Sequence, residues 1–384
     1  MRIGFDLRPA LRKNHRHRGI GKYTHQLLRS LLDRDPQHRY VVYILEGHEL
    51  SLPGKNFEVR ALPYLRRPNR LNWLLDWILL PLQLRKDRIQ LFHATDISSI
   101  PRTTFCRVWA HVHDMIPYLF WKETVQRSSV DYLLALRKFR RDMRRADLII
   151  TDSRHSKRDI CETLEKQSAE VQVIAPGCEE HFCPHPQREA RAIVQRHYGL
   201  HHPFLFYVGG TDFRKNLKRL IGAFRLLRQK GYPGKLVLAG ETFSSDIPEV
   251  REIRGHIEGC DLREHVSTIG YVPDEHLPHL YSACDFFVFP SLYEGFGLPV
   301  LEAMACGAPV VASRVSSIPE VAGEAALYFD PVQVESIAAS MIVAWESPNR
   351  LSDLRRKGFR QMQRFSWCHA AEKLLQTYHR HGLN

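Results

Sequence analysis

Short apolar runs alternate along the chain with longer segments whose apolar side chains recur every three or four positions. An apolar run over 3–7 is followed by a basic, polar stretch at 12–18 and then by an amphipathic segment that stops near Pro36. This order predicts a strand, a loop that ends in Gly19 and Gly21, and a helix. Further strands, with helical stretches between several of them, are predicted at 40–45, 91–93, 108–111, 148–151 and 171–175.

The alternation restarts after a proline-containing segment at 176–186, which we interpret as a linker between domains. An apolar run at 204–208 leads into Gly209 and Gly210 and then into a helix near Leu217. Two such series predict an α/β protein with two doubly wound domains, whose ligands bind at the carboxyl ends of the strands. The later strands are predicted at 236–239, 266–269, 286–289 and 309–312. The expected segments are 1–180, 181–365 and a terminal helix at 366–384.

Composition supports a globular protein and excludes a fibrous or disordered one. Of the 384 residues, 44% are hydrophobic and 25% are charged. The net charge of +13 is uneven, because residues 1–150 hold 28 lysines and arginines against 14 acidic residues, whereas the remainder is nearly neutral. A basic first domain suggests an anionic partner such as nucleic acid, phospholipid or a phosphorylated substrate, although a generally basic surface would give the same count.

Apolar stretches give no sign of a membrane span or an export signal. The most hydrophobic stretch, at 73–84, is too short to cross a bilayer and contains Asp76 and Pro81. Asp6 interrupts the first residues before any signal-peptide core could form. We therefore expect a cytoplasmic protein.

The eight cysteines are scattered and are expected to be reduced thiols. Cys178, His181, Cys183 and His185 lie close together, but they lack the second paired group of a structural zinc site. We expect no metal ion.

The most informative segment is an apolar strand at 286–289 that runs into a glycine loop and then a helix. Gly295 and Gly297 let backbone amides approach a ligand closely, and the following helix N-terminus favours phosphate. Glu294 lies in the loop, and Glu302 lies about two turns further on. This separation suits two hydroxyl-rich groups of one ligand, whereas the alternative is a solvated pair of surface carboxylates.

This segment resembles the retaining glycosyltransferases of family four. The resemblance rests on E-x7-E with Gly-Phe-Gly inside it, on Ala-Cys-Gly-x-Pro-Val-Val-Ala-Ser after it, and on Pro319-Glu320. It covers nearly the whole chain and is strongest over 207–330. It implies the GT-B fold: two Rossmann-like domains facing each other across a cleft, with a C-terminal helix that returns to the first domain.

The resemblance also implies roles for residues of the second domain. Glu302 would bind the ribose hydroxyls of a nucleotide, and Glu294 would bind hydroxyls of the donor sugar. The amides around Phe296, Gly297 and Leu298 would meet the sugar and the diphosphate. Contacts to the base would come from the backbone near Tyr271 and Val272.

The turn after the strand at 204–208 resembles the element of this family that grips the diphosphate. It contains Gly209 and Gly210 and continues to Arg214, Lys215 and Asn216. Fixed cations would stabilise the charge that grows on a departing phosphate oxygen. The alternative is that Arg214 and Lys215 are surface residues at a helix N-terminus with no ligand. This is a poorer explanation, because cations there oppose the helix dipole.

In the first domain, His113 and Asp114 follow a strand and match the His-Asp element that faces the donor sugar. A histidine after a strand is also a common structural feature. Gly19 and Gly21 resemble the first glycine loop, which approaches the diphosphate and the acceptor. Asp33-Arg34-Asp35 has the spacing of a metal-binding DxD motif, but we interpret it as the end of a helix.

The resemblance therefore implies a retaining, metal-independent hexosyltransferase without a cofactor. GDP-mannose is the favoured donor, by similarity to bacterial surface-polysaccharide mannosyltransferases such as those of lipopolysaccharide biosynthesis, and UDP- or dTDP-sugars are alternatives. Other possibilities are a GT-B phosphorylase or epimerase, and a non-catalytic protein that binds nucleotide sugar or nucleic acid. The set of Glu294, Glu302, Arg214 and Lys215 argues against nucleic acid.

The acceptor is expected to be a glycan or a lipid-linked glycan bound by the basic domain. Arginines at 66–70 precede the apolar stretch at 73–84, and a second basic cluster at 137–145 follows Leu133 and Leu134. Basic residues beside apolar ones suit an anionic membrane face, which predicts peripheral attachment at the inner leaflet. The alternative is a core helix covered by solvated arginines.

Overall fold

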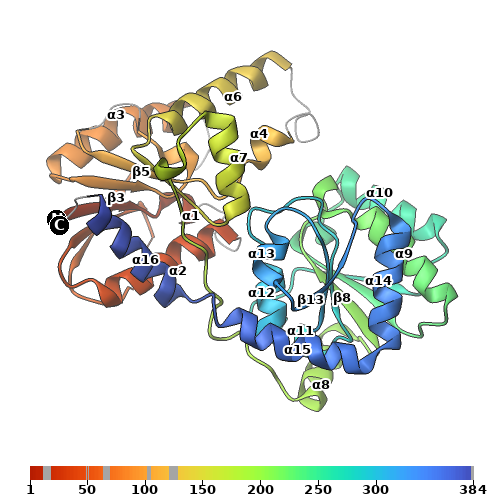
Figure 1. Cartoon of the computed structure of the whole chain (residues 1–384). Coiled ribbons are helices and arrows are strands. Elements are labelled where there is room, and N and C mark those ends of the chain that lie inside the picture. Colours follow the sequence, from red (N-terminus) through yellow and green to blue (C-terminus); the bar gives the residue numbers. More distant parts are fainter. Residues whose placement is uncertain are drawn as a thin grey trace. The chain divides into compact units, whose positions relative to one another are not determined.

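The computed structural model describes residues 1–11, 19–48, 50, 52–63, 70–101, 105–120 and 129–381 (Figure 1). The basic stretch at 12–18 lies outside the described residues. The chain forms two compact units, one made of Met1–Gly177 with Ser366–Asn384 and the other of Cys178–Phe365. The first unit thus ends three residues before the expected boundary at 180.

The first unit is built on a seven-stranded parallel sheet with the order β3-β2-β1-β4-β5-β6-β7. Every strand predicted from the apolar runs is present. The prediction omitted β3, because this edge strand is only partly buried and mixes Glu58 and Arg60 with its apolar residues. The strands are β1 Arg2–Asp6, β2 Arg39–Leu45, β3 Phe57–Leu62, β4 Leu91–Ala94, β5 Arg107–His111, β6 Leu148–Thr151 and β7 Val171–Val173.

Helices of the first unit bury their apolar sides against this sheet. Leu27, Leu28 and Leu31 of α2 share one buried cluster with Leu374 and Tyr378 of the C-terminal helix α16. The predicted return of the terminal helix to the first domain is confirmed. The helices are α1 Arg8–Leu11, α2 Gly19–Arg34, α3 Arg70–Lys86, α4 Ile116–Leu119, α6 Ser129–Arg144, α7 Arg154–Leu164 and α16 Trp367–Arg380, and two short 3₁₀ turns lie at Ile97–Ser99 and Ser168–Glu170.

The second unit is built on a six-stranded parallel sheet with the order β10-β9-β8-β11-β12-β13. The prediction omitted β13, which is again an edge strand with alternating burial. The strands are β8 Phe204–Val208, β9 Lys235–Ala239, β10 Val266–Gly270, β11 Phe287–Phe289, β12 Val310–Ser313 and β13 Ala326–Phe329.

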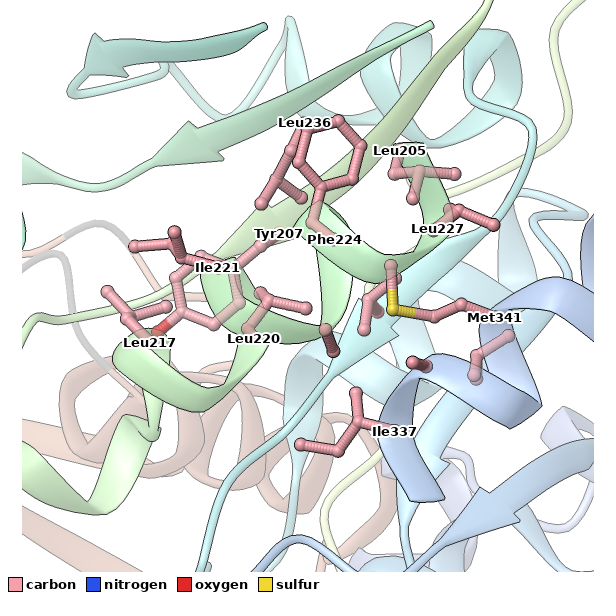
Figure 2. Close-up of a cluster of buried hydrophobic side chains, with 14 of the residues drawn as sticks. Leu205, Tyr207, Leu217, Leu220, Ile221, Phe224, Leu227, Leu236, Ile337 and Met341 are labelled. Carbon is pink, nitrogen blue, oxygen red and sulfur yellow. The ribbon is translucent and has the colours of Figure 1, made fainter. Parts of the chain in front are cut away.

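The core of the second unit lies where α9 and α14 pack on its sheet (Figure 2). Leu220, Phe224 and Leu227 of α9 are fully buried, and Met341 of α14 packs in the same cluster. The helices are α8 Gln187–Tyr198, α9 Leu217–Gln229, α10 Pro248–Gly259, α11 Leu277–Ala283, α12 Leu298–Ala305, α13 Ile318–Ala322, α14 Val334–Glu346 and α15 Pro348–Met362, with 3₁₀ turns at Phe213–Lys215 and Glu241–Ser244.

The two sheets confirm the prediction of two Rossmann-like domains. In each, the strand order reverses beside the first strand of the unit, at β1/β4 and at β8/β11. Crevices outside the carboxyl ends of the strands at such reversals are where ligands bind in doubly wound folds. Residues that bind a ligand are therefore expected at these strand ends.

Candidate active site

The turn after β8 is packed so closely that it requires glycine. The amide of Gly209 donates to the Ala239 carbonyl at 3.0 Å, and the Tyr207 hydroxyl donates to the Gly210 carbonyl at 2.8 Å. A Cβ atom on Gly209 would lie 2.5 Å from the Tyr207 hydroxyl, and one on Gly240 would lie 2.0 Å from the Gly209 carbonyl oxygen. The backbone of the predicted glycine turn thus packs directly against the backbone of the turn after β9.

Lys215 and Glu294, predicted from separate motifs, form an ion pair. Lys215 Nζ lies 2.6 Å from Glu294 Oε1, and their side chains are only 15% and 12% exposed. The ammonium group also lies 5.6 Å from the ring centre of Phe289, the last residue of β11. This pair places a cation and a carboxylate within one hydrogen bond of each other at the switch point of the second sheet.

Arg214 and Asn216, which lie on either side of Lys215, make different contacts. The Arg214 guanidinium lies 2.9 Å from a carboxylate oxygen of Asp212, and the Arg214 carbonyl accepts from the Leu292 amide at 2.7 Å. Asn216 has a left-handed backbone (φ 60°), and its amide nitrogen donates to the carbonyls of Pro290 (3.0 Å) and Pro331 (2.7 Å). Asn216 therefore ties three strand-end loops together, and its contact with the substrate stays a prediction.

Two serines after β12 hold the loop that carries Glu294. The Glu294 amide donates to the Ser316 hydroxyl at 2.9 Å. The Ser317 hydroxyl lies 2.9 Å from the Glu294 carbonyl and 2.7 Å from the Phe296 carbonyl. Neither serine was predicted from the sequence, although only Ile318 separates them from the Pro319-Glu320 pair of the family pattern.

The glycine loop ends at the N-terminus of α12 as predicted. Gly297 caps this helix with a left-handed backbone (φ 109°), and no side chain caps it. The backbone amides at Leu298 are thus at a helix end that favours an anion. Glu302, one of the later residues of α12, accepts a hydrogen bond from the Tyr281 hydroxyl at 3.0 Å. Burial raises the pKa of Tyr281, so its hydroxyl stays a donor that orients Glu302.

The loop after β10 lies beside the turns described above. The Gly270 carbonyl accepts from the Gly240 amide at 2.7 Å. Tyr271 is 48% exposed and Val272 is buried. Both therefore lie at the carboxyl edge of the second sheet, and their contact with a nucleotide base stays a prediction.

In the first unit, His113 lies at the carboxyl end of β5 and pairs with Asp152. Its Nδ1 is 2.9 Å from Asp152 Oδ2, and the ring packs against the edge of Tyr23 from α2. Burial by itself would lower the pKa of His113, but the charge and hydrogen bond of Asp152, with Asp114 and Asp96, raise it to about 9. Asp152 was not predicted as a site residue, although it directly follows the predicted strand at 148–151.

The other predicted residues of the first unit are placed differently. Asp114 accepts from the Ile116 amide at 2.9 Å at the start of α4. Gly19 and Gly21 lie in the first turn of α2, not in a loop before it as expected. A helix can begin here because glycine is tolerated near helix ends, where few intrahelical hydrogen bonds are lost.

Two further histidines are core residues. His93 and His111 are buried neighbours 3.1 Å apart, and His93 Nε2 lies 2.8 Å from the Tyr378 hydroxyl. Burial lowers the pKa of both, that of His93 to about 3. They are neutral at physiological pH and link α16 to the sheet.

The described residues contain neither a cluster of metal ligands nor a membrane-spanning helix. No group of three or more His, Cys, Asp or Glu side chains there could hold a metal ion, and no helix there is long and apolar enough to cross a bilayer. Asp35 is buried, contacts His38 at 2.7 Å and precedes the amino end of β2. The interpretation of Asp33-Arg34-Asp35 as a helix end is confirmed.

Comparison with protein families gives two matches that together span most of the chain. Residues 196–361 match the glycosyl transferases group 1, and residues 17–182 match Glycosyltransferase Family 4. The O-antigen chain mannosyltransferase B of Escherichia coli is 34% identical over 61% of this chain and 60% of its own length. The serotype-specific mannosyltransferase WbdA of Escherichia coli is 30% identical over 73% of this chain, and the match spans about a third of WbdA.

A solved structure of similar fold covers almost the entire chain. Anabaena Alr3699/HepE, determined in complex with UDP-glucose, superposes with a TM-score of 0.76 over 98% of this chain and 99% of that protein, at 17% identity. The predicted GT-B architecture of two Rossmann-like domains is thus confirmed at the level of fold.

Proposed function

Because residues 196–361 belong to the glycosyl transferases group 1 and residues 17–182 to Glycosyltransferase Family 4, we propose that this protein transfers a hexose from a nucleotide sugar to a glycan. The observation that carries the proposal is the Lys215–Glu294 pair at 2.6 Å. A nucleotide sugar joins a diphosphate to a polyol through one oxygen, so its site needs a cation and a carboxylate in close proximity. This pair meets that requirement at the strand ends of the second unit.

Different residues of the second unit would bind different parts of the nucleotide sugar. Lys215 and Arg214 neutralise the diphosphate together with the amides at the start of α12, and Glu294 binds hydroxyls of the hexose. Glu302, oriented by Tyr281, binds the ribose. Because two cations and a helix N-terminus would neutralise the negative charge of the diphosphate, the proposed reaction needs neither a metal ion nor a cofactor.

Transfer proceeds with retention at the anomeric carbon. The bond from this carbon to the phosphate oxygen breaks as the acceptor hydroxyl forms its bond on the same face. The acceptor proton passes to a phosphate oxygen of the departing nucleoside diphosphate, so no side-chain nucleophile is required. Lys215 acts mainly on the charge that develops on the leaving oxygen.

Mannose from GDP-mannose is the proposed donor, and the product is a cell-surface polysaccharide such as O-antigen. Support comes from the two relatives named as mannosyltransferases, of which this chain matches only part. A UDP-sugar is the second candidate, because the structural relative HepE was determined with UDP-glucose.

A thermal-shift panel of GDP-mannose, UDP-glucose and dTDP-glucose tests the donor site. At a hundred times its dissociation constant, the true donor stabilises the protein by about 2.7 kcal/mol, which is about 5 to 10 °C for a domain of this size. We expect GDP-mannose to give the largest shift, with and without EDTA. Glu302→Ala should lose the shift, whereas Glu335→Ala, at an exposed position of α14, should keep it. A wild-type protein that no nucleotide sugar stabilises would refute the proposal.

The first unit is proposed to attach to an anionic membrane that carries the acceptor, at its cytoplasmic face. Leu80 and Leu84 of α3 are buried, but Ile78 and Leu82 on the same helix are 49% and 55% exposed. The helix is therefore partly buried and partly an apolar surface, which does not match the alternative of a core helix covered only by solvated arginines. Leu133 and Leu134 of α6 are likewise exposed, beside the basic cluster at 137–145. Arg66 and Arg67 lie outside the described residues.

Vesicle sedimentation tests the membrane proposal. We expect binding to vesicles with anionic lipid, no binding to neutral ones, and release by salt, because the first 150 residues carry twice as many basic as acidic residues. Leu133→Ser with Leu134→Ser should weaken binding several-fold, about 1 kcal/mol or more for the loss of two apolar side chains from the interface. Equal binding to both kinds of vesicle, or to neither, would overturn the proposal.

A further inference from the structure

The imidazole of His113 is held in one orientation by Asp152 and Tyr23. Asp152, between β6 and α7, contacts Nδ1 at 2.9 Å. The ring of Tyr23 from α2 meets it edge-on, with centres 4.9 Å apart and planes at 80°. The Tyr23 hydroxyl is itself fixed by the Ile174 carbonyl at 3.2 Å. With Nδ1 committed to Asp152, only Nε2 is left to act on a ligand.

Nε2 of His113 is buried and has no hydrogen-bond partner among the described residues. The side chain is only 10% exposed. Buried polar atoms without a partner are rare in folded proteins, because each forgoes its hydrogen bonds with water. A nitrogen left in this state at the carboxyl end of a strand is suited to meet a substrate atom.

The surroundings of His113 are strongly acidic. Besides Asp152, the carboxylates of Asp114 and Asp96 act on the ring, from the turn before α4 and from the end of β4. The ionisable neighbours His111 and Tyr23 carry no charge, since burial lowers the pKa of His111 and raises that of Tyr23. Three carboxylates thus outweigh the desolvation of the ring, and both ring nitrogens of His113 carry protons at neutral pH.

We propose that Asp152 is a positioning residue that holds His113 as an imidazolium, whose Nε2–H donates a charged hydrogen bond to an oxygen of the sugar substrate. The sugar as the ligand rests on the proposed function, whereas the pairing and the neighbouring carboxylates lie within the first unit. A charged donor binds a hydroxyl or ring oxygen more strongly than a neutral one. Asp152 thereby determines what kind of oxygen the site accepts, without touching the substrate.

Nitrogen NMR of the unliganded protein tests the charge directly. With His113 assigned through His113→Gln, we expect its ring to titrate near pH 9 in the wild type. In Asp152→Asn the amide oxygen can still accept from Nδ1 but the charge is gone, so the pKa should fall well below its wild-type value. A neutral His113 at pH 7.5 in the wild-type protein, which needs no variant to observe, would overturn the inference.

The pH profile of kcat/KM tests the function of the pair. In the wild type, activity should fall only as the pH rises through about 9, where the imidazolium loses its proton. In Asp152→Asn the fall in activity with rising pH should begin at a lower pH than in the wild type. At pH 8 its kcat/KM should be about ten- to a hundredfold lower, as expected for the loss of a charged hydrogen bond. Asp159→Asn, which removes the carboxylate from the His155–Asp159 pair on α7, should leave the profile unchanged.

The two experiments separate this inference from the proposed function. An Asp152-dependent titration of His113 in a protein that uses no nucleotide sugar would refute the function and keep the pairing. Transfer activity whose alkaline limb is the same in Asp152→Asn and in the wild type would refute the inference and keep the function.

Discussion

Replacing Lys215 by methionine should lower kcat for transfer by about two to three orders of magnitude, the usual effect of removing one group that stabilises charge in a transition state. Methionine keeps the apolar contact of the side chain near Phe289 and removes the ammonium group. The effect should appear in kcat more than in KM, because the charge on the leaving oxygen grows as the bond breaks. Steady-state kinetics with the donor identified in the panel would measure it.

Loss of the ammonium group also leaves Glu294 without its partner, which must be separated from catalysis. Removing one member of a buried pair is destabilising by about 3 kcal/mol, and less here since both side chains are slightly exposed. Lys215→Met with Glu294→Gln should recover stability in thermal melts but not kcat. Lys218→Ala, at the exposed second position of α9, serves as the control. A Lys215→Met enzyme that turns over at nearly the wild-type rate would contradict the assignment.

Truncation after Ser366 should prevent the first unit from folding. The deleted helix α16 contributes Ala371, Leu374 and Tyr378, all fully buried in the cluster that also contains β1 and α2. Substitution of one such leucine by alanine destabilises a domain by about 2 to 5 kcal/mol, and deletion removes several such contacts at once. A marginally stable domain cannot absorb that loss.

Calorimetry would show this as the loss of one of two unfolding transitions, because the second unit has its own core. Leu374→Ala should lower the melting temperature of the first unit alone, whereas Gln376→Ala, on the exposed side of α16, should not. Two intact transitions after the truncation would show that α16 is dispensable for folding.

Periodicity in the sequence was sufficient for the interior strands and for the edge strands β7 and β10, and insufficient for the edge strands β3 and β13. β1, β8 and β11 are central or near-central strands covered on both sides, so their apolar runs are continuous. β3 and β13 lie at sheet edges, where half of each strand faces solvent and the apolar pattern is diluted. The apolar pattern is not diluted in α9, whose buried side consists of six apolar residues.

The start of α2 shows a second limit of sequence reasoning. Gly19 and Gly21 indicated a loop because glycine is a poor helix former. The structure begins α2 at Gly19, since packing of Leu27, Leu28 and Leu31 on the sheet stabilises the helix as a whole. Tertiary packing thus overrides a weak local preference at the first turn.

By itself, the sequence determined the fold class, the position of the candidate-site motifs on strand ends, and the separation of a basic first part from a nearly neutral second part. These properties are local or additive: they follow from spacing, residue type and charge. Only the tertiary structure decided which side chains meet. The contacts of Lys215 with Glu294, 79 positions apart, and of His113 with Asp152, 39 positions apart, exist because parallel strands bring their carboxyl ends to one edge. The spacing of residues along the sequence does not reveal these contacts. The pKa of His113 depends on its contact with Asp152.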